Sequence, residues 1–423
     1  MASDLRSTIP ARPIRYLILA LVTPFGLWGI GSTLINGHGG LATTQHVPWG
    51  LWVAAYLFFI GLSTGSFLIA TLGQVFGVKR LAPMAPMALM VALVSLLLGG
   101  MLIILDLGHP ERIYKVLTSP NTSSVLAWMG YVYNLYFFVL LGLLHLVLRP
   151  RLVARIRAGE GPSGFYRLLA FGRLSTDPEN LAGDVRWIKR LSLLGIAIAV
   201  FLQVGEGMIF AVAKARPEWF GALLPVVFLI GGIVAGGGIL TWLAATLEPR
   251  PGGGRLDLAR TLARITMSVL VLDLLLIFSK ALTALYGGVP QEVEAWSMTM
   301  FGPYWFVFWI LQICIGAVIP ILLLTLAATR DRLGAIGLAG LFMAAGMLGA
   351  RLSIVIPGQI VPTFQQLVTA YAHPRFAYGY VPSLTEWLVL TGVLAIGFWL
   401  FAAAKRFIPI GLEPGEATSQ GGK

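Results

Sequence analysis

The stretch from Met84 to Leu105, MAPMALMVALVSLLLGGMLIIL, contains no charged side chain. A helix needs about 20 apolar residues to cross the hydrocarbon core of a bilayer. Runs of this kind recur along all 423 residues, of which 57% are hydrophobic and 11% charged, and the mean hydropathy is +0.84. A soluble domain is typically about 45–50% apolar. The composition therefore excludes a water-soluble globule and predicts an all-α integral membrane protein.

Ten such runs, bounded by charged residues or by Gly and Pro clusters, predict ten transmembrane helices. They cover residues 14–35, 50–76, 84–105, 124–148, 187–213, 220–246, 259–286, 303–328, 333–356 and 386–407. An even number of crossings places both ends of the chain on one side of the membrane. Of the 30 Lys and Arg residues, 23 fall on that side, which the positive-inside rule identifies as the cytoplasm.

A weak internal repeat predicts how these helices are grouped. Trp49 is followed nine residues later by Phe-Phe-Ile-Gly61, and Trp219 is followed nine residues later by Phe-Leu-Ile-Gly231. We therefore expect helices 2–5 and 6–9 to form two parallel-related four-helix bundles, with helices 1 and 10 at their flanks. The expected divisions are 1–49 (N-terminal tail and helix 1), 50–213 (first bundle, with a basic cytoplasmic loop at 149–186), 214–356 (second bundle) and 357–423 (outer loop, helix 10 and cytoplasmic tail).

Two further features of these bundles have a structural interpretation. The basic loop at 149–186 is expected to be solvated and to set the orientation of the protein beside the lipid. The small-residue motifs Gly61-x-x-x-Gly65 and Gly232-x-x-x-Gly236 are expected to let helix backbones approach closely. We assign no chemistry to these glycines.

Scarce residue types exclude several kinds of cofactor. A single cysteine, Cys314, cannot ligate an iron–sulfur cluster or build a structural zinc site. Of the five histidines only His145 lies in a predicted span, whereas two b-type haems would need four at that depth. We expect no metal ligand set and no covalent cofactor, so any redox chemistry must use a partner's cofactors. The net charge of +12 follows from the topology, and we expect no nucleic-acid partner.

Several ionisable side chains fall at membrane depth, where each costs at least ~2.5–3.5 kcal/mol on insertion scales. Asp106, Glu206, Lys280 and Arg351 share the outer half of the bilayer. Asp273, two turns before Lys280, lies on the same helix face nearer the centre. One interpretation is structural ion pairing of Glu206 or Asp106 with Lys280 or Arg351. The other is a polar pocket whose groups exchange protons with a lipophilic ligand such as a quinone.

Polar tips on neighbouring segments extend the second interpretation. His109, three residues after Asp106, could exchange protons at the mouth of such a pocket, although residues of this kind are also common at membrane interfaces. In this interpretation the proton-transfer residues are Asp106, Glu206, Asp273 and Lys280. The quinone pocket is formed by Tyr56, Asp106, His109, Arg112, Tyr131, Asn134, Glu206, Lys280 and Arg351.

Motifs in a fixed order run through nearly the whole sequence. They are Pro48-Trp-Gly-Leu-Trp52 with Gly61-Leu-Ser-Thr-Gly65, Asp106-Leu-Gly-His-Pro-Glu-Arg112, Ala215-Arg-Pro-Glu-Trp219, Gly316-Ala-Val-Ile-Pro320, Gly349-Ala-Arg351 with Pro357-Gly-Gln359, and Tyr380-Val-Pro-Ser383 with Glu386. Together they resemble the NrfD/PsrC-like membrane subunits of respiratory oxidoreductases, the polysulfide reductase membrane subunit family. The similarity is greatest to the ten-helix branch with HybB-like and alternative-complex-III-like proteins.

The resemblance implies a quinone or quinol pocket near the outer face, with menaquinone or ubiquinone as an exchangeable substrate. It also implies an extracytoplasmic iron–sulfur subunit, which serves a catalytic partner of the molybdopterin or hydrogenase type. Three positions depart from the pattern. Tyr56 stands where some relatives have a histidine, Glu218 where relatives often have an aromatic residue, and Glu206 near a place where many HybB-like proteins have a histidine.

These observations predict a quinone-reactive subunit of an oxidoreductase in the bacterial cytoplasmic membrane, embedded in lipid and not a catalyst alone. Two alternatives remain open. A proton-coupled secondary transporter would also have ten helices, parallel repeats and acids in its spans. A purely structural membrane anchor would need no quinone site.

Overall fold

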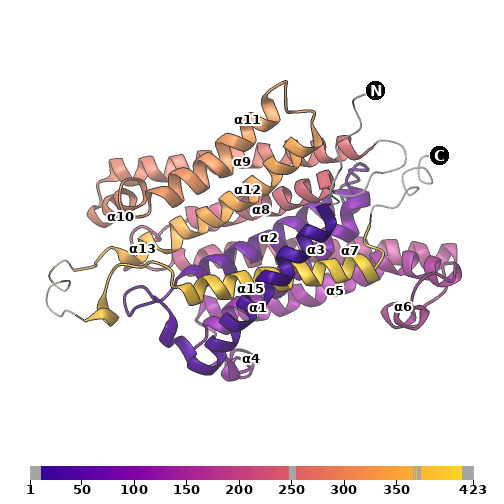
Figure 1. Cartoon of the computed structure of the whole chain (residues 1–423), viewed down its shortest axis with the longest axis horizontal. Helices are drawn as coiled ribbons and strands as arrows, with labels where there is room; N and C mark the ends of the chain where they lie inside the picture. Colours follow the sequence, from indigo (N-terminus) through magenta and orange to yellow (C-terminus); the bar gives the residue numbers. More distant parts are fainter. Residues whose placement is uncertain (1–10, 247–253, 365, 367, 369–372, 412–423) are drawn as a thin grey trace.

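Helices make up the regular structure of this protein. The computed structural model describes residues 11–246, 254–364, 366, 368 and 373–411 (Figure 1), and no β-strand occurs in this part of the sequence. The predicted N-terminal tail before residue 11, the end of the predicted cytoplasmic tail after residue 411 and part of the predicted outer loop lie outside the described residues.

The described residues contain ten helices that are long and apolar enough to cross a membrane, as the sequence predicts. They are α1 (Ala11–Asn36), α2 (Leu51–Gln74), α3 (Ala85–Asp106), α5 (Val125–Arg157), α7 (Pro178–Ala211), α8 (Leu223–Thr246), α9 (Arg255–Gly287), the π-helix η4 (Val307–Val318) continued by α11 (Ile319–Thr325), α12 (Leu333–Val355) and α15 (Leu384–Phe407). Short connecting helices are η1 (Gly37–Gly40), η2 (Ala82–Met84), η3 (Pro110–Arg112), α4 (Lys115–Thr118), α6 (Ser163–Leu169), α10 (Pro290–Met300), α13 (Pro357–Ile360) and η5 (Pro374–Phe376).

The long helices run side by side, so the molecule has two distinct ends (Figure 1). The start of α1, the end of α15 and α6 lie at one end, here called the termini end. Helices α10 and α13 lie at the opposite end, here called the far end. Helices α1 and α15 pack closely, since a Cβ atom on Gly26 would lie 2.2 Å from the Cα atom of Gly392.

Helix α2 lies at the centre of the bundle and contacts α3, α7, α8 and α12. It meets α8 backbone to backbone: a Cβ atom at Gly65 would lie 2.0 Å from the carbonyl oxygen of Gly232, and one at Gly236 would lie 2.2 Å from the amide nitrogen of Ser66. The two small-residue motifs therefore pack against each other, which confirms their predicted role. The grouping into two parallel-related bundles and the domain boundaries stay predictions.

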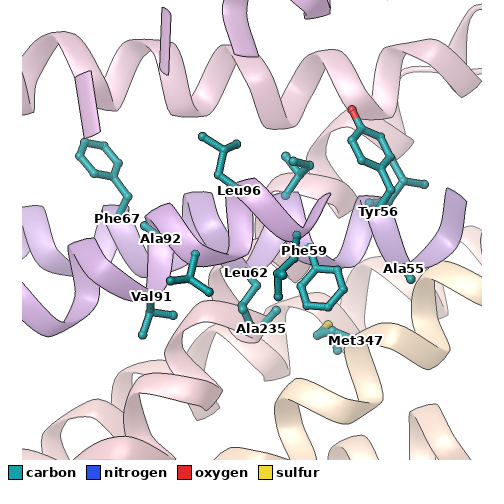
Figure 2. Close-up of a cluster of buried hydrophobic side chains, with 14 of the residues drawn as sticks. Ala55, Tyr56, Phe59, Leu62, Phe67, Val91, Ala92, Leu96, Ala235 and Met347 are labelled. Carbon is teal, nitrogen blue, oxygen red and sulfur yellow. The ribbon is translucent and has the colours of Figure 1, made fainter. Parts of the chain in front are cut away.

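Apolar side chains fill the space around this crossing. Figure 2 shows Leu62 of α2 beside Val91 of α3, with Ala235 of α8 and Met347 of α12 close by. All four side chains belong to one cluster of buried residues. Because lipid is as apolar as this core, close packing rather than burial from water holds such helices together.

The segment predicted as a solvated basic loop at 149–186 is mostly helical. Helix α5 continues to Arg157 and α7 already begins at Pro178, with α6 between them. Arg149 and Arg151 are only 1% and 5% exposed. Arg151 donates through Nη1 to the carbonyl oxygen of Gly411 at 2.9 Å. The prediction of a solvated loop is wrong for these arginines, because internal carbonyl and carboxylate groups take the place of water.

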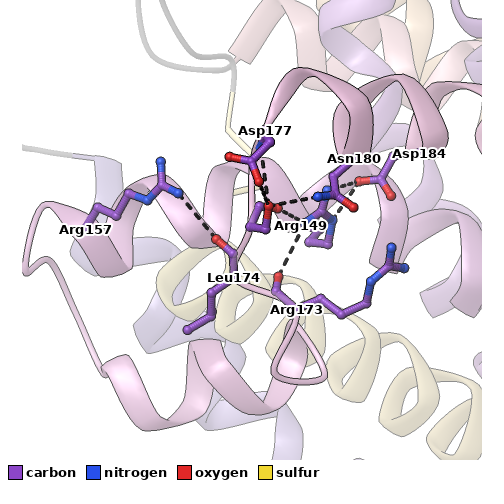
Figure 3. Close-up of polar contacts among 8 residues, drawn as sticks. Arg149, Arg157, Arg173, Leu174, Asp177, Asn180 and Asp184 are labelled. Carbon is purple, nitrogen blue, oxygen red and sulfur yellow. Dashed lines mark hydrogen bonds and ion pairs between the residues drawn. The ribbon is translucent and has the colours of Figure 1, made fainter.

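Figure 3 shows how Arg149 is held at the termini end. Its Nε atom donates to Asp184 Oδ2 at 2.6 Å, and its Nη2 atom forms an ion pair with the same carboxylate. Its Nη1 atom donates to the carbonyl oxygen of Ser175 at 2.5 Å. The guanidinium group thus ties the end of α5 to the start of α7.

The predicted outer loop covers the beginning of α2. The backbone amide of Gln45 donates to the carbonyl oxygen of Arg375 at 2.9 Å, and the amide of Leu51 donates to the hydroxyl of Tyr380 at 2.6 Å. Tyr380 in turn donates to Glu386 Oε1 at 2.6 Å. Burial, followed by the neighbouring Glu386, raises the pKa of Tyr380, so its hydroxyl stays a hydrogen-bond donor.

Candidate functional site

Four polar side chains meet inside the bundle, in its half nearer the far end. Tyr56 of α2, Glu206 of α7, Asp273 of α9 and Arg351 of α12 form what is here called the central cluster. Glu206, Asp273 and Arg351 are 0%, 1% and 2% exposed. Buried ionisable groups at membrane depth are costly and are commonly functional.

Glu206 is the acceptor at one side of the central cluster. The hydroxyl of Tyr56 donates a hydrogen bond to Glu206 Oε1. Glu206 Oε2 has no hydrogen-bond partner among the described residues. One oxygen of this carboxyl group is therefore available to a ligand or to a water molecule.

Arg351 is the cation of the central cluster. Its Nη2 atom donates to the carbonyl oxygen of Phe228 at 2.9 Å, and its guanidinium carbon lies 4.0 Å from the centroid of the Phe228 ring. Glu206 and Asp273 both interact electrostatically with it. A Cβ atom on Gly231 would lie 3.4 Å from Arg351 Nη2 and 3.5 Å from Asp273 Oδ1, so the absence of a side chain there leaves room for both groups.

The central cluster has the chemistry of a proton-exchange site. Two carboxyl groups share one guanidinium group. The central cluster can therefore gain or lose a proton while its net charge stays within one unit of zero. Asp273 Oδ2 and Arg351 Nε, like Glu206 Oε2, have no hydrogen-bond partner in the described part of the protein. Buried polar atoms are normally bonded to protein or to ordered water, and these atoms mark where a ligand or water would bind.

Gln203 is a polar neighbour that the sequence interpretation missed. It is 0% exposed. It accepts a hydrogen bond from Thr64 at 3.0 Å and donates to the carbonyl oxygen of Phe228 at 3.0 Å. Gln203 precedes Glu206 by three residues and so shares its helix face. The signal was an amide side chain within an apolar span, which the sequence interpretation used at Asn134 but not at Gln203.

Lys280 has a different partner from either of those expected. It forms an ion pair with Glu218, in the connection between α7 and α8, and also donates to the Glu218 carbonyl oxygen at 2.8 Å. Within the described residues no ion pair joins Lys280 to Glu206 or Asp106, so that structural pairing is wrong. Burial raises the pKa of Glu218 from 4.5, and the ammonium group of Lys280 opposes this rise.

Asp106 ends α3 at the far end, apart from the contacts of the central cluster. It is half-buried and interacts electrostatically with His38 and Glu386. His38 Nε2 lies 3.2 Å from the carbonyl oxygen of Leu105. Asp106 therefore belongs to a polar seam around the start of α2 and of α15.

Several sequence motifs meet in that seam. Gln359 accepts from the amide of Trp49 at 3.0 Å and donates to its carbonyl oxygen at 2.8 Å. The Trp49 ring stacks on the Trp219 ring at 5.7 Å, and Trp219 Nε1 donates to the carbonyl oxygen of Ile354 at 2.8 Å. These bonds fix the connections at the far end relative to α2.

The other predicted pocket residues are exposed and bond locally. His109 lies 3.0 Å from Glu111, which also faces Arg112 at 3.7 Å, instead of contacting Asp106. Tyr131 donates to the carbonyl oxygen of Leu117 at 2.7 Å, and Asn134 donates to that of Gly130, one turn earlier in α5, at 2.8 Å. The structure brings together the four residues of the central cluster. It does not bring His109, Arg112, Tyr131 or Asn134 into contact with that cluster.

Metal ligation has no candidate in the part of the protein that the structure describes, where no group of three or more His, Cys, Asp or Glu side chains could hold an ion. Cys314 of η4 is free and half-buried.

Comparison with known proteins identifies relatives along nearly the whole sequence. The family described as polysulphide reductase, NrfD, matches residues 40–363. A selenate reductase subunit of Mesobacillus selenatarsenatis is 31% identical over 405 residues, which cover 94% of each protein. The Hdr-like menaquinol oxidoreductase integral membrane subunit of Archaeoglobus fulgidus is 25% identical over 93% of this protein and 92% of its own length. A polysulfide reductase polypeptide of Wolinella succinogenes is 26% identical over 76% of this protein and 97% of its own length.

Proposed function

This protein belongs to the polysulphide reductase NrfD family, and from that premise we propose that it is the quinone-reactive membrane subunit of a respiratory oxidoreductase. Its relatives are membrane subunits of reductase and oxidoreductase complexes, one of which is named for menaquinol. The ten apolar helices of its described residues and its family make it a multi-pass membrane protein. We assign it menaquinone or ubiquinone as an exchangeable substrate.

The observation that carries this proposal is the central cluster. Quinone reduction takes up two electrons and two protons, and quinol oxidation releases them, so a site needs groups that hydrogen-bond the two oxygens and exchange protons. The hydrogen-bonded Tyr56 and Glu206 supply a phenol and a carboxyl group in the buried interior of the bundle. Arg351 offers a positive charge beside them.

In the proposed reaction this protein binds the quinone and exchanges protons with it, while a partner subunit supplies or accepts the electrons. Tyr56 and Glu206 face the substrate oxygens, and Asp273 passes protons along α9. Asp106 and Lys280 exchange protons nearer the far end, and His109, Arg112, Tyr131 and Asn134 line the approach. Electrons pass to or from an iron–sulfur subunit at the far end, which serves a molybdopterin or hydrogenase-type catalytic subunit.

The charge distribution supports an orientation for this arrangement. The basic residues of α5, α6 and α7, and Lys405 and Arg406 in the last turn of α15, lie at the termini end. By the positive-inside rule we place this end in the cytoplasm of a bacterial cell and the far end outside the cytoplasmic membrane. The partner subunits then dock at the far end.

The test uses the complex purified with its partner subunits. We expect Glu206→Gln to lower the turnover of a quinone analogue by about 100-fold, the size typical of a lost general acid or base. Glu179→Gln changes an exposed acid at the start of the same helix and should leave turnover unchanged. Unchanged turnover in Glu206→Gln would remove the central cluster from the reaction.

Co-purification separates the proposal from a transporter. A quinone-reactive subunit should co-purify with an iron–sulfur protein in mild detergent. The co-purified partner should show the visible absorption of its iron–sulfur clusters. A polypeptide that purifies alone and moves a solute in liposomes would contradict the proposal.

A further inference from the structure

A small cavity lies next to Lys280, between α8, α9, α10, η4 and α12. Its polar lining consists of Glu218, Lys280, Trp296, Thr299, Gln312 and Ser353. Apolar side chains such as Phe308 form the remaining walls. We call it the Lys280 cavity.

Four polar atoms in this lining have no hydrogen-bond partner within the described residues. They are Glu218 Oε2, Trp296 Nε1, Gln312 Oε1 and Ser353 Oγ. The residues Glu218, Trp296 and Gln312 are only 9%, 6% and 4% exposed. Leaving a buried donor or acceptor unpaired costs about 1–3 kcal/mol, so four such atoms on side chains that line one space favour an occupant that bonds to some of them.

The chemistry and size of the Lys280 cavity fit water. The indole N–H can only donate, the amide oxygen and the carboxylate can accept, and the hydroxyl can do both. The space available to the centres of water molecules is about 30 Å³, which accommodates about two of them. A water molecule needs two to four polar partners, and this lining supplies them.

The Lys280 cavity also lies on the way to the central cluster. Asp273, Ile277 and Lys280 follow each other at spacings of four and three residues, so they share one face of α9. Ile277 lines the cavity, as do Ala350 and Ser353, which lie beside Arg351 on α12. The next unpartnered atoms inward, again among the described residues, are Asp273 Oδ2, Arg351 Nε and Glu206 Oε2.

Outward, the Lys280 cavity adjoins the surface at the far end. A hollow of about 300 Å³ shares Glu218, Leu224 and Lys280 with it. The hollow is also lined by Phe220, which is 53% exposed. The ion pair of Glu218 and Lys280 therefore stands between the hollow and the Lys280 cavity.

We propose that the Lys280 cavity holds ordered water and conducts protons between the Glu218–Lys280 pair and the central cluster. The inference rests on the proposed function and adds Glu218, Trp296, Gln312 and Ser353 to it. In each transfer one O–H bond breaks and another forms along the line of waters and carboxyl groups, and no electron moves. The ammonium group of Lys280 keeps Glu218 paired when its carboxyl group has released a proton.

Radiolytic hydroxyl-radical labelling tests the water without any turnover. In the purified complex, Trp296 should be labelled strongly, because radicals form from ordered water beside it. Trp52 is the control, since it is 2% exposed and its Nε1 atom already donates to the carbonyl oxygen of Glu386. Labelling of Trp296 as low as that of Trp52 would overturn the proposal.

Two variants test the ligands of this water. Gln312→Met keeps the side-chain length and removes the amide, and we expect it to reduce labelling of Trp296. Gln74→Met is the matched control. Gln74 is the last residue of α2, away from the Lys280 cavity, and it accepts a hydrogen bond from Ser192 at 3.2 Å. Unchanged labelling in Gln312→Met would contradict the role of Gln312 as a water ligand.

Glu218→Gln in liposome-reconstituted complex tests conduction. We expect proton release or uptake coupled to quinone turnover to slow by about 10-fold or more, with binding of a quinone analogue unchanged. Wild-type rates in Glu218→Gln would contradict proton conduction through the Lys280 cavity and would leave the proposed function intact. A wild-type complex that does not react with quinone at all would instead refute the proposed function, and the labelling result would still decide whether the cavity holds water.

Discussion

Two buried arginines, Arg149 and Arg351, show how the same side chain serves different ends of this molecule. They are 1% and 2% exposed. Arg149 meets the carboxylate of Asp184 through two nitrogens and also donates to a backbone carbonyl. Arg351 donates to one carbonyl, lies over an aromatic ring, and has an Nε atom without a partner among the described residues.

The difference lies in the acids that accompany each arginine. Asp184 is fixed directly against Arg149 by an ion pair and a hydrogen bond. Asp273 and Glu206 influence Arg351 electrostatically, and in the described part of the protein neither forms an ion pair with it. Burial alone therefore does not distinguish structure from chemistry, whereas a direct ion pair with a buried carboxylate does.

The largest expected effect concerns Arg149, the arginine with a direct ion pair. Arg149→Met should lower the free energy of unfolding by about 3–5 kcal/mol, because it leaves Asp184 as a buried charge without its partner. Denaturant unfolding followed by helix content measures this loss. The double variant Arg149→Met with Asp184→Leu should recover most of it, since an apolar pair needs no compensation. No recovery would mean that Asp184 is not the group that makes the single variant unstable.

A smaller loss of stability is expected at the other arginine, together with a large loss of function. Arg351→Met removes one hydrogen bond to a carbonyl, while Asp273 and Glu206 can take up protons in response. We expect quinone turnover to fall by about 100-fold and the midpoint of unfolding to shift less than in Arg149→Met. Equal destabilisation by the two substitutions would contradict the distinction between a structural Arg149 and a functional Arg351.

The helix crossing beside Arg351 gives an intermediate effect. Gly65→Val would place a side chain against the backbone of α8 at Gly232, where a Cβ atom has only 2.0 Å. Overpacking of this kind typically costs about 1–3 kcal/mol. Gly31→Val is the control, because a Cβ atom there meets nothing within 4 Å. Thermal unfolding in detergent should separate the two variants, and similar stability would show that α2 and α8 can move apart freely.

The smallest effect is a pH dependence at Glu218. Burial raises its pKa above 4.5, against the opposing influence of Lys280, so the folded state binds more protons than the unfolded state. This contribution to stability is full below the ordinary carboxyl pKa and is lost as the pH rises through the raised value. Glu218→Gln should flatten this decline in thermal unfolding measured between about pH 4 and pH 8. A slope identical to that of the wild type would assign the dependence to other groups.

Most of the fold could be predicted from the sequence. The ten spans follow from the lengths of the apolar runs, and the close backbone approach at Gly61 and Gly65 follows from small-residue spacing. The ends of α5 and α7 could not be predicted this way. Arg149 and Arg151 were assigned to a solvated loop because a charge normally ends an apolar run, and only the folded protein supplies the distant carboxylate and carbonyl groups that bury them.

The candidate site was predicted only in part. Glu206, Asp273 and Arg351 were found because an ionisable residue in an apolar helix needs a partner. Lys280 was paired with the wrong acid, since Glu218 lies 62 residues away in a connecting segment. Tyr131 and Asn134 could not be oriented, because an almost uniformly apolar helix gives no sign of which face is inward.

The backbone contact between α2 and α8 also limits how the molecule can move. Alternating access requires one group of helices to rock against another, and here that motion would have to separate backbones that touch at Gly65 and Gly232. Electron and proton transfer need only small side-chain shifts around a fixed frame. A crossing this tight suits a protein that works as a rigid holder, through which charge passes while the helices stay in place.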